Sequence, residues 1–175
     1  MVVYGTKAKN DMEKLYQYSD FEFFWGTAHP FSQWHPSEFQ VRGIQFNCAE
    51  QFMMYQKAAL FDDAEMAKQI LAAKEPGVQK KLGRKVRNFD QQTWLMARIP
   101  IVYNANYAKF TQNENLKKFL LGTKGKWIVE ASPVDRIWGI GLSVNDKRAR
   151  QPENWQGENL LGQVLMTLRA NLLSF

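Results

Sequence analysis

The 175-residue sequence contains few of the side chains that build disulfide frameworks, metal sites or catalytic triads. Cys48 is the only cysteine, which excludes a disulfide within the chain and a thiolate metal cluster. His29 and His35 are the only histidines and lie in one early segment. A histidine-rich metal site or a Ser-His-Asp triad would have to use that segment. No spacing typical of metal ligands is present, and we expect neither a metal nor another cofactor.

The sequence also lacks long apolar runs. No segment approaches the roughly 20 apolar residues that cross a membrane as a helix, and the opening MVVYGTKAKN lacks the apolar core of a signal peptide. We therefore expect a cytoplasmic protein with no membrane partner. Without repeats, low-complexity tracts or an evident linker, the sequence predicts a single domain over residues 19–175, preceded by an N-terminal extension of residues 1–18.

Positive charge and aromatic side chains are plentiful. The formal net charge of +6 favours anionic partners, such as phosphorylated metabolites or nucleic acid. The six tryptophans offer flat surfaces on which a base or a sugar can stack. The basic segment NDKRAR, residues 145–150, fits a contact with nucleic acid, but such a cluster is more often a solvated loop.

The hydrophobic pattern predicts a helix-rich α+β fold, with a small antiparallel sheet flanked by helices. FEFFW (21–25) and KWIVEAS (126–132) indicate strands, and FQVRGIQF (39–46) indicates a hairpin that turns at Arg42-Gly43. Helical periodicity begins at Cys48, and Pro100 predicts a kink or break in the longest helix. The expected helical segments are 48–61, 62–75, 76–86, 90–110, 113–123 and 159–173.

Glu50 and Lys57 form the first candidate group. Their spacing of seven residues is nearly two helical turns, so both side chains emerge on one face of the helix. Such a pair is often a surface ion pair that contributes only ~0.3 kcal/mol. The apolar and aromatic residues between them instead indicate a largely buried helix. A charged pair there has to be mutually paired, solvated through a cleft, or functional.

Arg84 and Trp94 form the second group. Arg84 follows a glycine at the expected end of a helix, where its guanidinium can grip a phosphate or simply complement the helix dipole. Trp94 lies on the next helix and either packs in the core or offers a stacking surface. Trp25, at the end of the first expected strand, is a further aromatic candidate.

The third group lies in WIVEASPVDRIWGIG (127–141) and at the start of the last helix. Two carboxylates there flank an aromatic ring, and two glycines permit close approach by a ligand or by neighbouring backbone. The asparagine that starts the last helix can cap it or bind a ligand, and exposed amides at that helix start can bind phosphate. These candidates are Glu130, Asp135, Trp138, Gly139, Gly141 and Asn159.

Taken in order, several segments resemble the NADAR domain, also called the YbiA-like family. The resemblance runs from FEFFW to the last helix and rests on FSQW, CAEQFMMYQKA, GR followed ten residues later by Trp94, AKF, WIVEASPVDRIWGIG, WQGENLLG and LMTLR. It implies a helix-rich α+β fold whose members act on ribose joined to a base through nitrogen. Some members are N-glycosidases of phosphorylated riboflavin-pathway intermediates; others resemble hydrolases that remove ADP-ribose from guanine in nucleic acid. Gln51 stands where many members have histidine, which argues against a histidine role there but leaves the neighbouring carboxylate in place.

This resemblance leads to the hypothesis of an N-glycosidase acting on a phosphorylated ribosyl small molecule or on ADP-ribosylated nucleic acid. Glu50 would be the principal catalytic carboxylate, with Asp135 orienting the ribose or serving as a second carboxylate. Lys57 allows a rival route through a Schiff base with the sugar. The alternative function is a non-catalytic module that binds ADP-ribose or NAD. The expected substrate-binding residues are Trp25, Arg84, Trp94, Glu130, Trp138, Gly139, Gly141 and Asn159.

Overall fold

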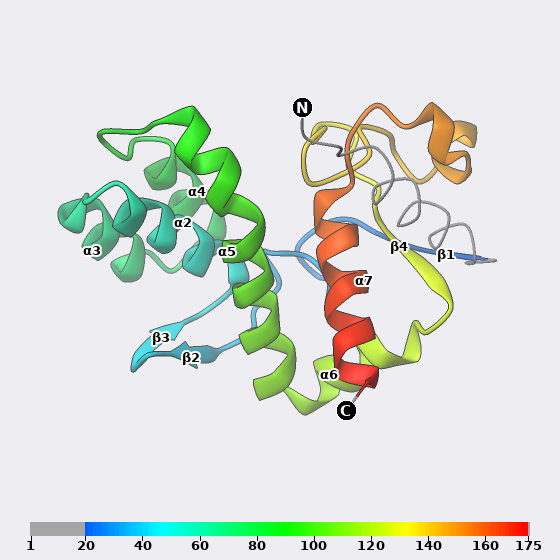
Figure 1. Ribbon diagram of the computed structural model, residues 1–175, viewed down its shortest axis with the longest axis horizontal. Coiled ribbons are helices and arrows are strands. Elements are labelled where there is room, and N and C mark those ends of the chain that lie inside the picture. Colours follow the sequence, from blue (N-terminus) through cyan, green and yellow to red (C-terminus); the bar gives the residue numbers. More distant parts are fainter. Residues whose placement is uncertain (1–19, 175) are drawn as a thin grey trace, which may run out of the picture. The chain divides into compact units, whose positions relative to one another are not determined.

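The computed structural model describes residues 20–174, so the predicted N-terminal extension of residues 1–18 lies outside the described residues. Within the described part of the chain there are six α-helices, four short β-strands and two 3-10 helices (Figure 1). The predicted helix-rich α+β class is confirmed. None of the described helices is long and apolar enough to cross a membrane.

Contacts between Cα atoms divide the described chain into two compact units. The first unit contains the first strand and Thr123–Met166, and the second contains Trp25–Gly122 and the chain from Thr167 onward. Both units are therefore discontinuous in sequence. A single functional domain over residues 19–175 stays a prediction.

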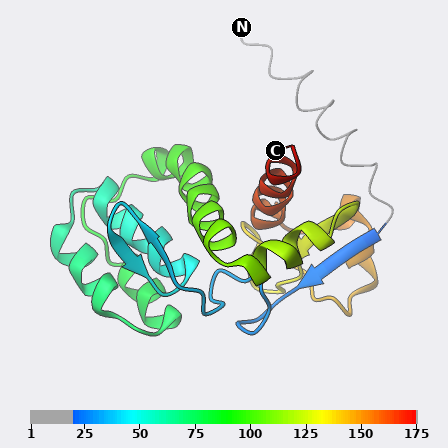
Figure 2. The same ribbon diagram turned by 90° about the horizontal axis from the view of Figure 1, so that it is seen from below.

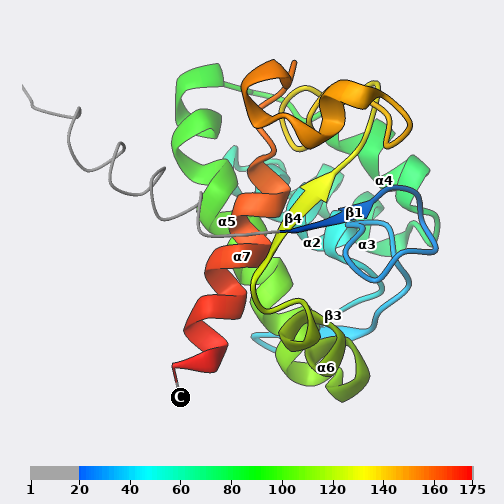
Figure 3. The same cartoon turned by 90° about the vertical axis from the view of Figure 1, so that its right-hand side faces the viewer.

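The first unit is built around two strands, β1 (Asp20–Phe24) and β4 (Lys126–Glu130), which run side by side (Figure 3). They pair in parallel, with Phe21 opposite Trp127. An antiparallel sheet was expected, but strand propensity does not determine direction, and strands joined by a long connection can pair either way. The unit also contains the 3-10 helices η1 (Lys147–Arg150) and η2 (Pro152–Asn154) and the first part of α7 (Leu160–Leu173).

The second unit contains the predicted hairpin. Strands β2 (Phe39–Val41) and β3 (Ile44–Phe46) pair antiparallel, and Figure 2 shows them as a twisted ribbon. Arg42 and Gly43 have φ angles of 50° and 80°, as a two-residue turn of type I′ requires. The predicted antiparallel pairing is thus confirmed for this hairpin. Its inward side chains join a core cluster of Phe39, Phe46, Ala49, Phe52, Ala105 and Ala108.

The helices of the second unit start where local capping signals place them. Asp63 accepts a hydrogen bond from Met66 N–H, Asp90 accepts one from Thr93 N–H, and Pro76 opens its helix. The five helices are α2 (Ala49–Leu60), α3 (Ala64–Ala72), α4 (Pro76–Gly83), α5 (Gln91–Gln112) and α6 (Glu114–Gly122).

A kink or a break was predicted at Pro100, and because helix α5 continues through this residue the break does not occur. A proline inside a helix leaves the carbonyl group four residues earlier without its usual donor. That carbonyl belongs to Met96, which is 82% exposed, and Pro100 is exposed as well. Water can therefore bond to the carbonyl group, which lowers the cost of keeping the helix intact.

Candidate active site

Glu50 is a buried carboxylate in the first turn of α2. Its residue is only 4% exposed, and α2 buries every residue from Ala49 to Met54. The predicted burial of this part of the helix is confirmed. The N–H group of Glu50 donates to the carbonyl oxygen of Gln33 at 2.9 Å. The carboxylate thus lies at the positive end of the helix dipole, which favours negative charge.

Lys57, in the last turn of α2, lies among aromatic rings. Its Nζ atom is 4.3 Å from the ring centroid of Phe89 and 5.4 Å from that of Trp94. Burial lowers the pKa of Lys57, and the positive charge of Arg84 lowers it further. The structure therefore brings three predicted residues, Lys57, Arg84 and Trp94, into one neighbourhood.

Phe89 belongs to the same neighbourhood and was missed by sequence reasoning. It precedes Asp90, the N-cap of α5, and Trp94 is the fourth residue of that helix. A hydrophobic residue before the cap and another at the fourth helical position are the sequence signature of a hydrophobic staple. This signature was available in FDQQTW and would have placed Phe89 beside Trp94.

Arg84 ends α4, where its N–H group donates to the carbonyl oxygen of Lys80 at 3.1 Å. The preceding Gly83 packs closely against α2, since a Cβ atom there would lie 2.0 Å from Sδ of Met54, whose side chain would have to move. Close packing of α4 against α2 thus places the end of α4. The positive charges of Arg84 and Lys57 repel each other, and an anion bound to both side chains would relieve that repulsion.

Asp135, in the first unit, organises a turn. Its Oδ1 atom accepts hydrogen bonds from the N–H groups of Ile137 and Trp138, at 2.9 and 2.8 Å. Its carbonyl oxygen accepts a third from Gly141 N–H at 3.0 Å. This arrangement is an Asx-type turn. The side chain of Asp135 therefore has a structural role, whatever else it does, and Trp138 is half-buried beside it.

Asn159 fastens the start of α7 to strand β4. Its Oδ1 atom accepts from Glu130 N–H, and its Nδ2 atom donates to the carbonyl oxygen of Ile128, both at 3.0 Å. Asn159 is buried and has a φ of 52°, a backbone region that asparagine tolerates better than most residues. Both polar groups of the side chain are thus bound to the protein's own backbone.

The backbone around α7's start is likewise occupied. The carbonyl groups of residues 136–140 accept hydrogen bonds of 2.9–3.2 Å from N–H groups within residues 156–161. Three of those donors are the consecutive N–H groups of residues 159–161. The sequence predicted exposed amides at the start of α7, but these N–H groups already donate to carbonyl groups of residues 137–139. They are therefore not available to bind a phosphate.

Gly139 and Gly141 serve this backbone packing. A Cβ atom at Gly139 would lie 2.8 Å from the carbonyl oxygen of Glu130, and Gly141 has a φ of +69°. Of the two explanations that the sequence left open, a neighbouring backbone accounts for Gly139. The predicted contacts of these glycines with a ligand stay predictions.

The basic segment 145–150 is partly neutralised within the protein. Arg148 forms an ion pair with Asp146, with Nη2 and Oδ2 2.8 Å apart, and the guanidinium of Arg150 lies 5.3 Å from the ring centroid of Phe23. A contact of this segment with nucleic acid stays a prediction. Trp25, which follows β1, is 60% exposed and offers an open aromatic face.

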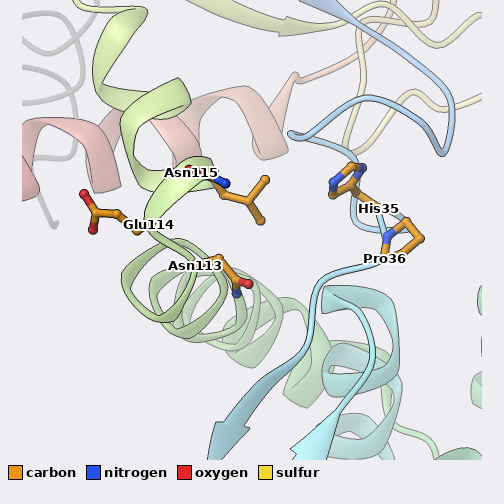
Figure 4. Close-up of a pocket in the computed structure, with 6 residues that line it drawn as sticks. His35, Pro36, Asn113, Glu114 and Asn115 are labelled. Carbon is orange, nitrogen blue, oxygen red and sulfur yellow. The ribbon is translucent and has the colours of Figure 1, made fainter.

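A separate hollow of about 320 Å³ lies in the second unit, between the loop before β2 and the start of α6 (Figure 4). Figure 4 shows His35 and Pro36 on one side and Asn113 and Asn115 on the other, with the carboxylate of Glu114 directed away. None of the predicted catalytic or substrate-binding residues lines it. Within residues 20–174 no group of three or more His, Cys, Asp or Glu side chains is arranged to hold a metal ion.

The model of the NADAR domain family matches residues 23–173. The chain belongs to the NADAR domain family. Its sequence is 47% identical over 148 residues to an N-glycosidase of Acanthamoeba polyphaga mimivirus, covering 81% of this chain and 86% of that protein. It is 38% identical over 168 residues to the protein irg-1 of Caenorhabditis elegans, covering 87% and 79%.

Two further comparisons concern a longer relative and a solved structure. A chloroplastic riboflavin biosynthesis protein of Zea mays is 32% identical over 113 residues, which cover 62% of this chain but only 16% of that protein. The NMR structure of YbiA from Escherichia coli superimposes with a TM-score of 0.74 at 25% identity, covering 90% of this chain and 87% of that one. The YbiA-like fold that the sequence predicted is confirmed.

Two residues close to Glu50 in the sequence have structural roles in this NADAR domain. Cys48 is buried, and burial raises the pKa of its thiol to about 11, so it is not a thiolate nucleophile at neutral pH. Gln51 accepts from Asn47 N–H at 2.8 Å and donates to the carbonyl groups of Ile70, Leu71 and Ala73, each at 3.1 Å. Gln51 therefore ties α2 to the end of α3.

Proposed function

We propose that this NADAR domain protein is an N-glycosidase that hydrolyses the bond between ribose and a nitrogen of a base. The observation that carries the proposal is Glu50, a carboxylate buried in the first turn of α2. A buried carboxylate needs compensation, and catalysis of a reaction that develops positive charge on a sugar is one reason to retain it. The similarity to an N-glycosidase over most of both chains supports the same reaction class.

Hydrolysis breaks the C1′–N bond and joins a water oxygen to C1′. Positive charge develops on the ribosyl ring as the base departs, and a nearby carboxylate stabilises it. In the proposed mechanism Glu50 provides that negative charge and takes one proton from the attacking water. The departing nitrogen receives a proton, so one water molecule is consumed, and a free sugar and a free base are released.

The group around Lys57 fits the remainder of such a substrate. Arg84 and Lys57 bring two positive charges together, which suits a phosphate group on the ribose. Trp94 offers a ring for the base, and stacking of a base on an aromatic side chain contributes ~1–3 kcal/mol. We propose a phosphorylated riboflavin-pathway intermediate or ADP-ribosylated guanine as the substrate.

Lys57 also allows a covalent route. Its lowered pKa increases the fraction of neutral amine, which can displace the base at C1′. Opening of the sugar ring then gives an imine, and water releases the sugar and restores the lysine. Borohydride reduces such an imine to a stable amine, so a mass increase confined to the Lys57 peptide is expected for this route. No trapped adduct, together with nearly full activity of Lys57→Arg, would rule it out.

The decisive experiment is product analysis on two substrates in parallel. One is a phosphorylated ribosylamino-pyrimidine of riboflavin synthesis, and the other is an oligonucleotide that carries ADP-ribosyl-guanine. We expect wild type to release ribose phosphate or ADP-ribose from one of them, and Glu50→Gln to lose that activity. Glu65→Gln is the matched control, because Glu65 is the second residue of α3 as Glu50 is of α2.

A different result would replace the proposal. If wild type releases nothing from either substrate but binds ADP-ribose tightly, the protein is a non-catalytic binding module. If Glu50→Gln and Glu65→Gln both retain full activity, the reaction is right but its catalytic carboxylate is not Glu50.

A further inference from the structure

Helix α5 holds the segment that leads to Glu50 at two successive residues. Nζ of Lys109 donates to the carbonyl oxygen of Ser32 at 2.8 Å, and Nδ2 of Asn106 donates to Oε1 of Gln33 at 2.9 Å. Lys109 and Asn106 lie three residues apart and therefore on one face of the helix. Both side chains are fully buried, which is unusual for a lysine. Burial of a polar or charged group costs free energy unless the group is hydrogen-bonded.

The orientation of both amide side chains follows from these bonds. Nδ2 of Asn106 also donates to the carbonyl oxygen of Val102 at 2.8 Å, and a carbonyl oxygen can only accept. Asn106 therefore presents its amide donors to both Val102 and Gln33. Gln33 must turn its Oε1 toward Asn106, which leaves its Nε2 buried and without an acceptor. A buried donor without an acceptor costs ~1–3 kcal/mol. The other contacts of Gln33 must therefore stabilise this side-chain orientation by more than that cost.

Gln33 is in turn hydrogen-bonded to the backbone of Glu50. Its carbonyl oxygen accepts the N–H group of Glu50 at 2.9 Å, at the first turn of α2. The path from Asn106 of α5 to the backbone of Glu50 thus consists of two short hydrogen bonds joined through Gln33.

We propose that Asn106 and Lys109 are positioning residues that fix Glu50 through the neighbouring residues Gln33 and Ser32. This inference rests on the proposed function, in which Glu50 is the catalytic carboxylate. Neither residue needs to touch the substrate. Their effect arises because displacement of a catalytic group by about 1 Å can cost about 100-fold in rate.

The chain offers a matched control on the same helix. Gln112 accepts from Gln40 N–H and donates to the carbonyl oxygen of Gln40, both at 2.8 Å. It therefore ties α5 to the hairpin strand β2 with two hydrogen bonds, whereas Asn106 makes one bond to Gln33 and one to Val102 within α5. A general loosening of α5 would affect both sites, whereas the proposed positioning of Glu50 involves Asn106 and not Gln112.

The test compares Asn106→Leu, Gln33→Met, their double variant and the control Gln112→Leu. Leucine and methionine keep the approximate shape while removing the amide groups, and Gln33→Met keeps the backbone bond to Glu50. We expect kcat to fall about 10- to 100-fold in both single variants with KM within about threefold. Both substitutions remove the same hydrogen bond, between Asn106 and Gln33. The kcat of the double variant is therefore expected to be no lower than that of the slower single variant. Gln112→Leu is expected to keep kcat within about twofold.

Amide hydrogen exchange at Glu50 gives a readout independent of turnover. We expect faster exchange of this N–H group in Asn106→Leu and Gln33→Met, and unchanged exchange in Gln112→Leu. If Asn106→Leu does not fold, Lys109→Met replaces it, since it removes the neighbouring bond to Ser32. Unchanged kcat and unchanged Glu50 exchange in the folded variants would overturn the inference.

Glu50→Gln separates this inference from the proposed function. If Glu50→Gln is inactive while the Asn106 and Gln33 variants keep full activity, only the positioning role is wrong. If Glu50→Gln is as active as wild type, the assignment of Glu50 is wrong. In that case the rate of amide hydrogen exchange at Glu50, compared between wild type and the Asn106 and Gln33 variants, still shows whether α5 constrains the start of α2.

Discussion

Replacing Lys109 with methionine tests whether the buried amine is neutral in the folded protein. Lys109 is fully buried, and burial lowers the pKa of its ammonium group to about 7 from an ordinary 10.5. Below pH 7 the folded and unfolded chains both carry the proton, and the burial cost is fully present. Between pH 7 and 10.5 the unfolded chain holds a proton that the folded chain has released. Stability therefore rises with pH across this window and levels off above it.

The size of the effect follows from proton linkage. One proton released on folding changes the free energy of unfolding by about 1.4 kcal/mol per pH unit. From pH 7.5 to 9.5 Lys109 alone would then add about 3 kcal/mol of stability. Two titratable neighbours interact with it electrostatically: Cys48 raises the pKa of Lys109 somewhat, and Lys109 itself lowers the pKa of His35. The pKa of His35 is lowered by burial and that of the Cys48 thiol is raised to about 11, so neither changes charge in this range.

The assay is urea unfolding at pH 7.5, 8.5 and 9.5 for wild type and Lys109→Met. Methionine fills similar space and does not titrate. Subtracting the two free energies of unfolding removes the contribution of the other ionisable groups. We expect the difference, wild type minus variant, to rise by about 1.4 kcal/mol per pH unit. A difference that does not change with pH would show that Lys109 keeps an ordinary pKa and that the reasoning from burial is wrong.

Two further predictions concern the first unit. Asp135→Asn keeps an oxygen that can accept the two backbone N–H groups, so we expect it to fold as stably as wild type, whereas Asp135→Ala should lose about 1 kcal/mol in urea unfolding. Loss of turnover in Asp135→Asn despite normal stability would give Asp135 a catalytic role; full turnover would limit it to the turn. Gly157→Ala would place a Cβ atom 2.3 Å from the carbonyl oxygen of Gly139, and we expect about 1–3 kcal/mol of destabilisation and a lower Tm. Gly122→Ala meets no atom within 4 Å and serves as its control, and equal Tm values for the two variants would contradict the packing argument.

Local signals in the sequence predicted most of the elements correctly. The turn at Arg42-Gly43, the caps Asp63 and Asp90 and the opening proline Pro76 each act within a few residues of the element that they define. The buried environment of Glu50 was also predictable, because the apolar residues that follow it lie on the same helix. Such features depend on neighbours in the chain.

The remaining features depend on residues far apart in sequence, and no local pattern encodes them. The parallel pairing of β1 with β4 joins strands about a hundred positions apart. The bond from Lys109 to Ser32 spans 77 positions, and the clamp of Asn159 on Glu130 spans 29. A lysine in an amphipathic helix gives no sign that it will be fully buried. The role of Lys109 was therefore missed, and the bonds of Asn159 to β4 were not anticipated, while its predicted contact with a substrate stays a prediction.

The hydrogen bonds between residues 136–140 and 156–161 divide the long irregular segment into a fixed base and a tip. The base is fastened on both sides, so an insertion there would separate donors from their acceptors. Residues 141–155 form the intervening tip, and the entropy of closing a loop grows only slowly with its length. Length variation among related chains should therefore be concentrated in the tip, between residues 140 and 156, and a tag or reporter peptide placed near residue 145 should leave the fold intact.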